Sequence, residues 1–371
     1  MKKIINFLSS AKLAILLGFL FMSFSFAGAV LPQEGVMEPR EITEWQAEHP
    51  LVTSLLSQTG LFHAFRSWPF LAVLLALGIN TLVCTITRLL GGEETRRYST
   101  LEYLGSVIFH VSLIMLFAGG FWSAAARFDG YVVLTEGQMF REVAPSYLRY
   151  AEGPLRRREH TGFLAQLKSV YLKYESGKHL VNLVSTFEVE EASGRAREHK
   201  VKVNHPWKHK GLAFTQDKTG FSPCLSIHDT ATGKLLFDSF VALKTFQHGS
   251  TKEHKDFISL PVHGERLQMT LYPSFSREGG KIHNAGDELT KPLLRLERMD
   301  ESGNVTASKD IESNETAVLG DLSVQFADLR YWASFRIVDD PGYPLVVVAM
   351  WLGFAALLAR YAQGMISWLK E

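Results

Sequence analysis

The chain has 371 residues, of which 46% are hydrophobic, and its 39 basic side chains nearly balance 38 acidic ones. A formal net charge of +1 gives no reason to expect nucleic acid as a partner. Its two cysteines, Cys84 and Cys224, form no Cys-x-x-Cys motif, which excludes a thioredoxin-like reductase and a c-type cytochrome by the chain's own covalent chemistry. Cys84 lies in an apolar run and Cys224 in a polar one, so no disulfide between them is expected.

The first apolar stretch, residues 13–31, follows Lys12 and predicts a transmembrane helix. A cleaved signal peptide is the alternative, because Ala27-Gly28-Ala29 has the small side chains of a cleavage site. The apolar run is longer than the roughly 7 to 15 residues of a signal peptide, which favours the transmembrane helix. In both interpretations the residues that follow are exported.

Residues 32–67 are polar with regularly spaced apolar residues, and they predict an amphipathic helix on the outer membrane surface. His49 and His63 lie here, where a solvated surface role is favoured over a ligand role.

Residues 68–86 form the second predicted span. Its polar residues are expected to face other helices, with Cys84 as a small apolar filler beside them; they are Asn80, Thr81 and Thr85.

Residues 87–103 predict a cytoplasmic loop, because short basic loops stay inside, and this places the N-terminus inside as well. Residues 104–126 form the third predicted span and contain His110. At 1.5 Å per residue, His110 lies about 9 Å above Leu104, in the cytoplasmic third of the hydrocarbon. Gly119-Gly120 predicts the close approach of another helix near the outer end.

Residues 127–342 carry short β-type runs separated by Gly, Asn, Asp and Pro, and Asp229–Lys234 predicts a hairpin loop. About 215 residues are enough for a separate hydrophobic core. Residues 343–371 predict a fourth span and a cytoplasmic tail, with both termini inside. The predicted fold class is therefore an integral membrane α-helical protein with four transmembrane helices plus a large extracytoplasmic β-rich domain.

No Gly-rich phosphate loop, His-Glu-x-x-His motif or nucleophile elbow is present, so we do not expect an enzyme that acts alone. Of thirteen histidines, only His110 falls in a predicted span. A neutral imidazole in the membrane suits proton relay or ligation of haem iron, whereas the alternative is a packing histidine bonded to a neighbouring helix, for example through Ser106. The residues alone leave both interpretations open. For the exported His205, His209 and His228 a metal site is disfavoured, because Pro206 argues against a helix.

Several segments, taken in order along most of the chain, resemble the ResB (CcsB) family of cytochrome c biogenesis membrane proteins. The segments that carry the resemblance are Leu8–Ala14 with Leu31-Pro32-Gln33, Ser67–Phe70 with Asn80–Thr85 and Arg88, Phe109–Leu113 with Gly119-Gly120, Glu136-Gly137, Val203–Pro206 with Gly211 and Gln216, Asp229 with Thr232–Lys234, and Asp340-Pro341-Gly342. One departure is the exit from the first span, which lacks the Gly-Thr pair common in the family before Pro32-Gln33. This indicates a divergent branch.

The resemblance implies a multi-pass subunit of the system II cytochrome c synthesis complex in the bacterial cytoplasmic (inner) membrane, with its large domain outside. Its implied partners are a CcsA/ResC-like membrane protein that carries a tryptophan-rich haem-handling motif absent here, apocytochrome c, and thiol-reducing proteins. The implied cofactor is haem b, which crosses to the outer face and is joined to the Cys-x-x-Cys-His thiols of the apocytochrome. By this resemblance His110 is the candidate ligand of the haem iron. The resemblance does not extend to His63, which is kept as a second candidate for which a solvated surface role is favoured.

Two hypotheses follow from the sequence. The first is a haem-handling accessory subunit of a haem-attachment complex. The alternative is a purely structural docking subunit that binds no haem itself. A proton-coupled transporter is disfavoured, because the four predicted spans contain no acidic residue and no repeat.

Overall fold

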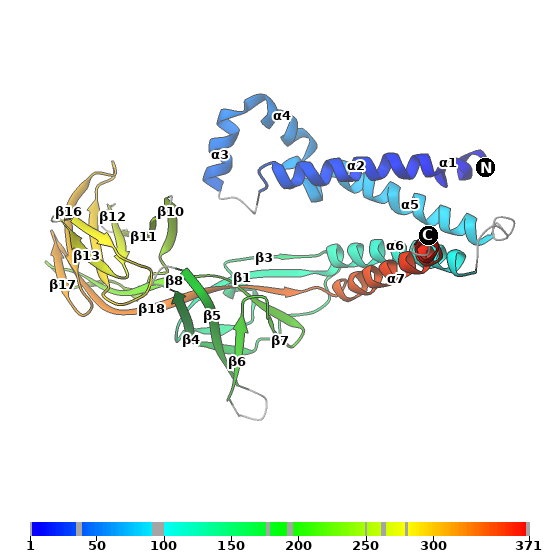
Figure 1. Cartoon of the computed structure of the whole chain (residues 1–371). Coiled ribbons are helices and arrows are strands. Elements are labelled where there is room, and N and C mark those ends of the chain that lie inside the picture. Colours follow the sequence, from blue (N-terminus) through cyan, green and yellow to red (C-terminus); the bar gives the residue numbers. More distant parts are fainter. Residues whose placement is uncertain are drawn as a thin grey trace. The chain divides into compact units, whose positions relative to one another are not determined.

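The computed structural model describes residues 2–34, 39–90, 100–175, 179–190, 196–248, 251–260, 265–278 and 281–368. The chain divides into two compact units, one of residues 1–125 and 341–371 and one of residues 126–340 (Figure 1). Within these described residues, four helices are long and apolar enough to cross a membrane, and a large region forms antiparallel sheets. The predicted fold class is therefore confirmed. The four candidate spans are Ala11–Val30, Trp68–Thr87, Thr100–Ala126 and Tyr343–Ala362.

The helices that contain these spans differ in length from the predicted segments. The sequence predicts spans over 13–31, 68–86 and 104–126 and a final span with tail over 343–371, whereas the helices are α2 (Ala11–Val30), α5 (Trp68–Leu90), α6 (Thr100–Ala126) and α7 (Tyr343–Trp368). Because α6 begins four residues earlier than predicted, His110 lies about 15 Å along the helix axis from its first residue. Residues 91–99 of the predicted cytoplasmic loop, and residues 369–371 of the predicted tail, lie outside the described residues.

The stretch predicted as one amphipathic helix, residues 32–67, is broken into three short helices. They are α3 (Pro39–Glu48), α4 (Pro50–Thr59) and the 3-10 helix η1 (Leu61–Arg66), while α1 (Lys2–Leu8) precedes α2. Pro50 begins α4 because its fixed φ suits the first helical turn. Gly60 ends α4 with a φ of +71°, a left-handed conformation that favours glycine.

Gln33 ties the end of α2 to η1. Its side-chain Nε2 donates to the carbonyl of Leu61 at 3.1 Å, and its Oε1 accepts from the Ala64 amide at 2.9 Å. The Ala64 side chain is completely buried, and a Cβ added to Gly28 would lie 2.9 Å from its Cβ. The Pro32-Gln33 pair that contributes to the family resemblance therefore has a structural function at this exit.

Helices α6 and α7 pack along a seam of small residues. Gly105, Ser112 and Gly119 are seven residues apart on α6, which places them in one line along the helix. A Cβ added to Gly105 would lie 2.8 Å from the backbone of Ala356, and a Cβ added to Gly119 would lie 3.0 Å from the Val346 side chain. The predicted close approach is therefore found at Gly119, whereas a Cβ on Gly120 would meet nothing within 4 Å.

This seam gives a matched pair of glycine substitutions. Gly105→Ala is expected to destabilise the protein by about 1–3 kcal/mol, because the new methyl group forces the α7 backbone to shift. Gly120→Ala is expected to be neutral or to stabilise by up to about 1 kcal/mol, since alanine is the better helix former. Thermal unfolding in detergent measures both. Equal melting temperatures of the Gly105→Ala and Gly120→Ala variants would contradict the close packing of α6 on α7.

The unit of residues 126–340, the β domain, forms four antiparallel sheets in the part of it that the structure describes. The largest has the order β3-β1-β18-β8-β7, with β17 and β9 paired to β18 and β8, and the others are β10-β11-β12-β15-β16, β2-β4-β5-β6 and the hairpin β13-β14. The strands are β1 (Phe128–Thr135), β2 (Met139–Arg141), β3 (Arg149–Glu152), β4 (Leu164–Glu175), β5 (His179–Glu190), β6 (Ala196–Lys202), β7 (Trp207–His209), β8 (Leu212–Asp229), β9 (Leu235–Phe240), β10 (Lys244–His248), β11 (Thr251–Leu260), β12 (Glu265–Tyr272), β13 (Phe275–Glu278), β14 (Lys281–Asn284), β15 (Leu293–Met299), β16 (Val305–Ile311), β17 (Thr316–Leu319) and β18 (Leu322–Asp339).

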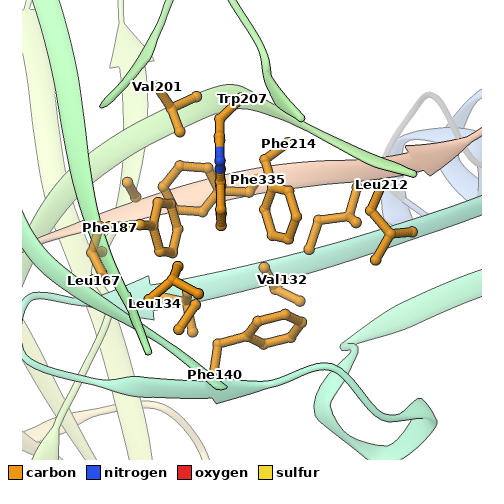
Figure 2. Packing of buried hydrophobic residues seen from close by; sticks show 14 of the residues in the cluster. Val132, Leu134, Phe140, Leu167, Phe187, Val201, Trp207, Leu212, Phe214 and Phe335 are labelled. Atoms are coloured by element: carbon orange, nitrogen blue, oxygen red, sulfur yellow. The ribbon is translucent and has the colours of Figure 1, made fainter. Parts of the chain in front are cut away.

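Two hydrophobic cores lie along the 18-residue strands β8 and β18. The first contains Phe187, Trp207, Phe214 and Phe335, whose rings turn toward one another in Figure 2. The second is mainly aliphatic and includes the fully buried Phe326. Both strands pass from one core to the other (Figure 1), and β-bulges in their pairing allow them to bend on the way.

The predicted hairpin loop at Asp229–Lys234 joins β8 to β9, and this prediction is confirmed. The Asp229 carboxylate accepts the backbone amides of Ala231 and Thr232 at 2.9 and 2.8 Å. Gly233 supplies the left-handed conformation, with a φ of +67°. The Asp-Thr-Gly-Lys part of the resemblance is thus explained by turn geometry.

Candidate functional site

The imidazole of His110 is oriented by its own helix. Its Nδ1 lies 2.8 Å from the backbone carbonyl of Ser106, one turn earlier in α6. A carbonyl oxygen only accepts hydrogen bonds, so Nδ1 carries the proton and the Nε2 lone pair points away from the helix. The bond to Ser106 lies within α6, so it is not the link to a neighbouring helix that the packing interpretation requires.

Cys84 of α5 lies beside the Nε2 atom of His110. The two atoms, Cys84 Sγ and His110 Nε2, are 3.9 Å apart, which is within reach of a weak S–H donor. Both side chains are half-buried. Cys84 is therefore more than an apolar filler, because it contacts the one ionisable side chain that the sequence places in a span.

His110 and the α7 seam lie on opposite sides of α6. At 100° per residue, His110 is rotated by roughly 140° to 180° from Gly105, Ser112 and Gly119. Phe117 lies on the His110 side, where a Cβ added to Gly78 of α5 would be 3.8 Å from its ring. His110 therefore lies on the side of α6 that contacts α5.

The other polar residues of α5 are buried and hydrogen-bonded, as expected for helix packing. Asn80 donates to the carbonyl of Leu8 at the end of α1, which ties α5 to the α1–α2 junction. The hydroxyls of Thr81 and Thr85 donate to carbonyls one turn earlier in α5. The prediction that these residues face helices is confirmed by their burial.

The donor set at His110 fits a haem iron. A neutral imidazole nitrogen is a common axial ligand of haem, and a second-sphere bond to its other nitrogen, here from Nδ1 to Ser106, fixes the ring in the required tautomer. The Cys84 thiol now lies in front of Nε2. Binding of iron at Nε2 therefore requires this thiol to move aside.

His63 lies far from His110 along α5. It belongs to η1, just before α5 begins at Trp68, and its half-exposed ring has Nε2 at 3.5 Å from Glu34 Oε2. Cys84 follows Trp68 by 16 residues of helix, which is about 24 Å. His63 and His110 therefore do not ligate the same iron, and His63 stays a separate candidate. His49 stacks on Trp45 with ring centroids 4.6 Å apart.

The histidines of the β-rich region that were singled out in the sequence do not gather into a site. His205 lies in a turn before β7, His209 ends β7, and His228 lies in β8. The expectation that no helix joins His205 and His209 is confirmed. In the described part of the chain, no three His, Cys, Asp or Glu residues are grouped so that they could hold a metal ion.

Glu136-Gly137, which also carries the resemblance, forms the turn between β1 and β2. The Glu136 carboxylate accepts the amides of Val170 and Tyr331 at 2.6 and 3.1 Å, and Gly137 has a φ of +85°. The Arg330 guanidinium donates to the Glu136 carbonyl at 2.9 Å. These contacts join β4 and β18 to the turn, so the acidic residue has a structural role here.

The model of the ResB-like family matches residues 11–92 and 99–363. Cytochrome c biogenesis protein CcsB of Microcystis aeruginosa is 19% identical over 96% of this chain and 85% of its own length. Cytochrome c biogenesis protein Ccs1 of Porphyra purpurea is 18% identical over 99% of this chain and 89% of its own.

Cytochrome c biogenesis protein ResB of Bacillus subtilis is 29% identical over 24% of this chain and 17% of its own length. Among solved structures, the cytochrome c haem lyase CcmF gives a TM-score of 0.27 at 14% identity, over 93% of this chain and 39% of that one, which is too low a likeness to define the fold. The match of the family model to most of the residues and the relatives that align over nearly the whole length agree: the chain belongs to the ResB-like family of cytochrome c biogenesis proteins.

Proposed function

We propose that the protein is a haem-handling subunit of a system II cytochrome c synthesis complex, and that His110 ligates the haem iron inside the membrane. The observation that carries this proposal is the orientation of the His110 imidazole: the bond from Nδ1 to Ser106 turns the Nε2 lone pair away from α6 and toward Cys84 of α5, whose thiol would move aside for the iron. The likeness to relatives named cytochrome c biogenesis protein supports the same assignment.

In this proposal the protein lies in the bacterial cytoplasmic membrane with both termini inside and the β domain outside. Its partners are a CcsA/ResC-like membrane protein, apocytochrome c and thiol-reducing proteins. The haem, when bound, supplies the vinyl groups that thioether formation consumes on the outer face. Because His110 lies within α6, this attachment takes place elsewhere, and His110 holds and orients the iron on the way.

The alternative is a docking subunit that binds no haem. The contact between Cys84 Sγ and His110 Nε2 favours it, because the thiol gives the imidazole a packing partner without any ligand. Under this alternative the β domain would hold the partner or the apocytochrome, and the α5–α6 interface would be purely structural.

One experiment separates the two functions. The full chain is purified with and without the CcsA/ResC-like partner, and haem is measured by its reduced absorption spectrum and by pyridine haemochrome content. Maturation of a c-type reporter is followed in cells that lack the chain. A b-type spectrum together with lost maturation supports haem handling. Maturation that requires the chain while no haem is retained in either preparation would support the docking subunit.

A further inference from the structure

The loop of residues 153–158, between β3 and β4, lies where the β domain joins the membrane helices. The Gly153 amide donates to the Arg127 carbonyl at 2.8 Å. Arg127 directly follows Ala126, the last residue of α6. Since consecutive Cα atoms are about 3.8 Å apart, chain connectivity alone keeps this end of the loop beside the end of α6.

The other end of the loop is tied to the strand that leads into α7. The Arg158 guanidinium donates to the Asp339 carboxylate at 3.0 Å. Asp339 ends β18, and Tyr343 begins α7 four residues later. Both ends of the loop are therefore held within a few residues of a membrane-spanning helix, whatever the angle between the β domain and the membrane helices.

Arg156 fixes the middle of the loop by turning inward. Its guanidinium lies 4.0 Å from the centroid of the Phe128 ring and forms an ion pair with Glu152. Only 5% of its side chain is exposed. Because this residue is held inside, the loop presents the neighbouring side chains, Leu155 and Arg157, on its outer surface.

A buried carboxylate holds the chain after the loop. The Glu142 carboxylate accepts hydrogen bonds from His160 Nδ1 at 2.6 Å, and from the Thr161 hydroxyl at 2.9 Å and the Thr161 amide. The Gly162 amide also donates to the Glu142 carbonyl. The loop is thus preorganised on both sides, so its outward residues keep one position relative to the β domain.

The outward side chains combine apolar and basic character. Leu155 is 49% exposed, and Pro154 and Arg157 are also exposed. Among the described residues Arg157 has no ion-pair partner. An exposed leucine can bury apolar area at the headgroup boundary, and an arginine beside it can bind a lipid phosphate.

The length of α6 places the loop at the level of the headgroups. Its 27 residues span about 40 Å, close to the 40–45 Å of a bilayer that includes its headgroup layers. The end of α6 is therefore expected at the level of the headgroups, and Gly153 begins the loop there because it is bonded to Arg127, the next residue.

We propose that residues 153–158 form a lipid-binding loop, in which Leu155 enters the bilayer interface and Arg157 binds the phosphate of an anionic glycerophospholipid. This contact would hold the β domain against the membrane independently of any haem. It does not depend on the function proposed above.

Photo-crosslinking of the full chain tests the proposal. The photoreactive residue p-benzoylphenylalanine replaces Leu155 in one variant and Leu235, the first residue of β9 and 50% exposed, in the control. Leu235 of β9 pairs with His228 of β8, and His228 pairs with Ser323 of β18. Ser323 is about 50 Å along β18 from Asp339, the residue bonded to the loop, so position 235 is far from the loop along this strand. Replacement of Phe121, 68% exposed in α6, is the positive control for lipid labelling.

We expect mass spectrometry to find phospholipid adducts at positions 155 and 121 and none at 235. In nanodiscs, we expect more adduct at 155 with phosphatidylglycerol than with phosphatidylcholine alone, and we expect Arg157→Gln to reduce this preference by about fivefold. Lipid adducts at 121 but not at 155, or a protein adduct at 155 in cell membranes, would overturn the proposal. A headgroup preference unchanged in Arg157→Gln would refute the role of the arginine.

Discussion

Replacing His110 by alanine is expected to lower the haem content of the purified protein by at least about tenfold while the protein stays folded. Alanine removes the Nε2 atom, and no other imidazole is seen in the described part of the α5–α6 interface to replace it. A ligand bond worth only about 1.4 kcal/mol already changes occupancy tenfold below saturation. The measurement is the reduced spectrum and the haemochrome content of the full chain prepared together with its partner.

Two matched variants make this result specific. His49→Ala removes an imidazole that stacks on Trp45, and it is expected to leave the haem content unchanged. Cys84→Ala removes the thiol in front of Nε2, and it is expected to keep or raise the haem content, because the iron then has unobstructed access. A wild-type haem content in a folded His110→Ala protein would contradict the assignment of His110 as the haem ligand. Loss of haem in His63→Ala instead would indicate that the ligand lies in η1.

The second large effect is expected at Glu142. Glu142→Gln is expected to destabilise the β domain by about 2–4 kcal/mol, because hydrogen bonds to a buried charge are among the strongest and their donors lose their charged acceptor. The side chain of Glu142 is 1% exposed and accepts from His160, Thr161 and Tyr147. Thermal or denaturant unfolding followed by tryptophan fluorescence measures the change.

Glu188→Gln is the matched control, since it makes the same chemical change at an exposed ion pair with Lys168. Such pairs contribute about 0–1 kcal/mol, so the control is expected to stay near the wild type. An equal loss of stability in Glu142→Gln and Glu188→Gln would contradict the proposed contribution of the buried Glu142 carboxylate.

The same residue predicts a dependence on pH. Burial raises the pKa of Glu142, but the hydrogen bonds from His160, Thr161 and Tyr147 outweigh it, so the net pKa lies below the ordinary 4.5. As pH falls, the unfolded chain takes up this proton first. The stability from Glu142 is therefore present above about pH 4.5 and lost as pH falls through the lower pKa of the folded state. Below pH 4.5 the difference in stability between wild type and Glu142→Gln should shrink.

The sequence predicted those features that depend on local composition. Length and hydropathy were enough for four spans, because a membrane helix must be apolar over its whole length. His110 could be recognised because an ionisable side chain in such a helix is rare. The turn at Asp229–Lys234 was predicted because its residues specify its geometry.

What the sequence did not reveal depends on contacts between distant residues. Cys84 and His110 are 26 residues apart on different helices, and nothing in either segment indicates that the two atoms meet. No motif around Glu142 identifies it as a buried acceptor, and only its contacts with Tyr147 and His160 show this role. The break of residues 39–66 into three helices was not predicted, because the prediction followed the spacing of the apolar residues. It did not consider that Pro50 begins a helix and that Gly60 ends one.

The pairing of β1 with β18 has a consequence for how the protein forms. The side chains of Asp129 on β1 and Arg336 on β18 are hydrogen-bonded although they are 207 residues apart in sequence, so the largest sheet stays incomplete until nearly the whole domain has been synthesised. Contacts so distant in sequence slow folding, and an unfinished sheet leaves strand edges open to aggregation. Since β18 leads into α7 within a few residues, insertion of that last helix and closure of the sheet are late, neighbouring steps. We therefore expect chains that end before β18 to be cleared by proteases rather than to persist as a folded fragment.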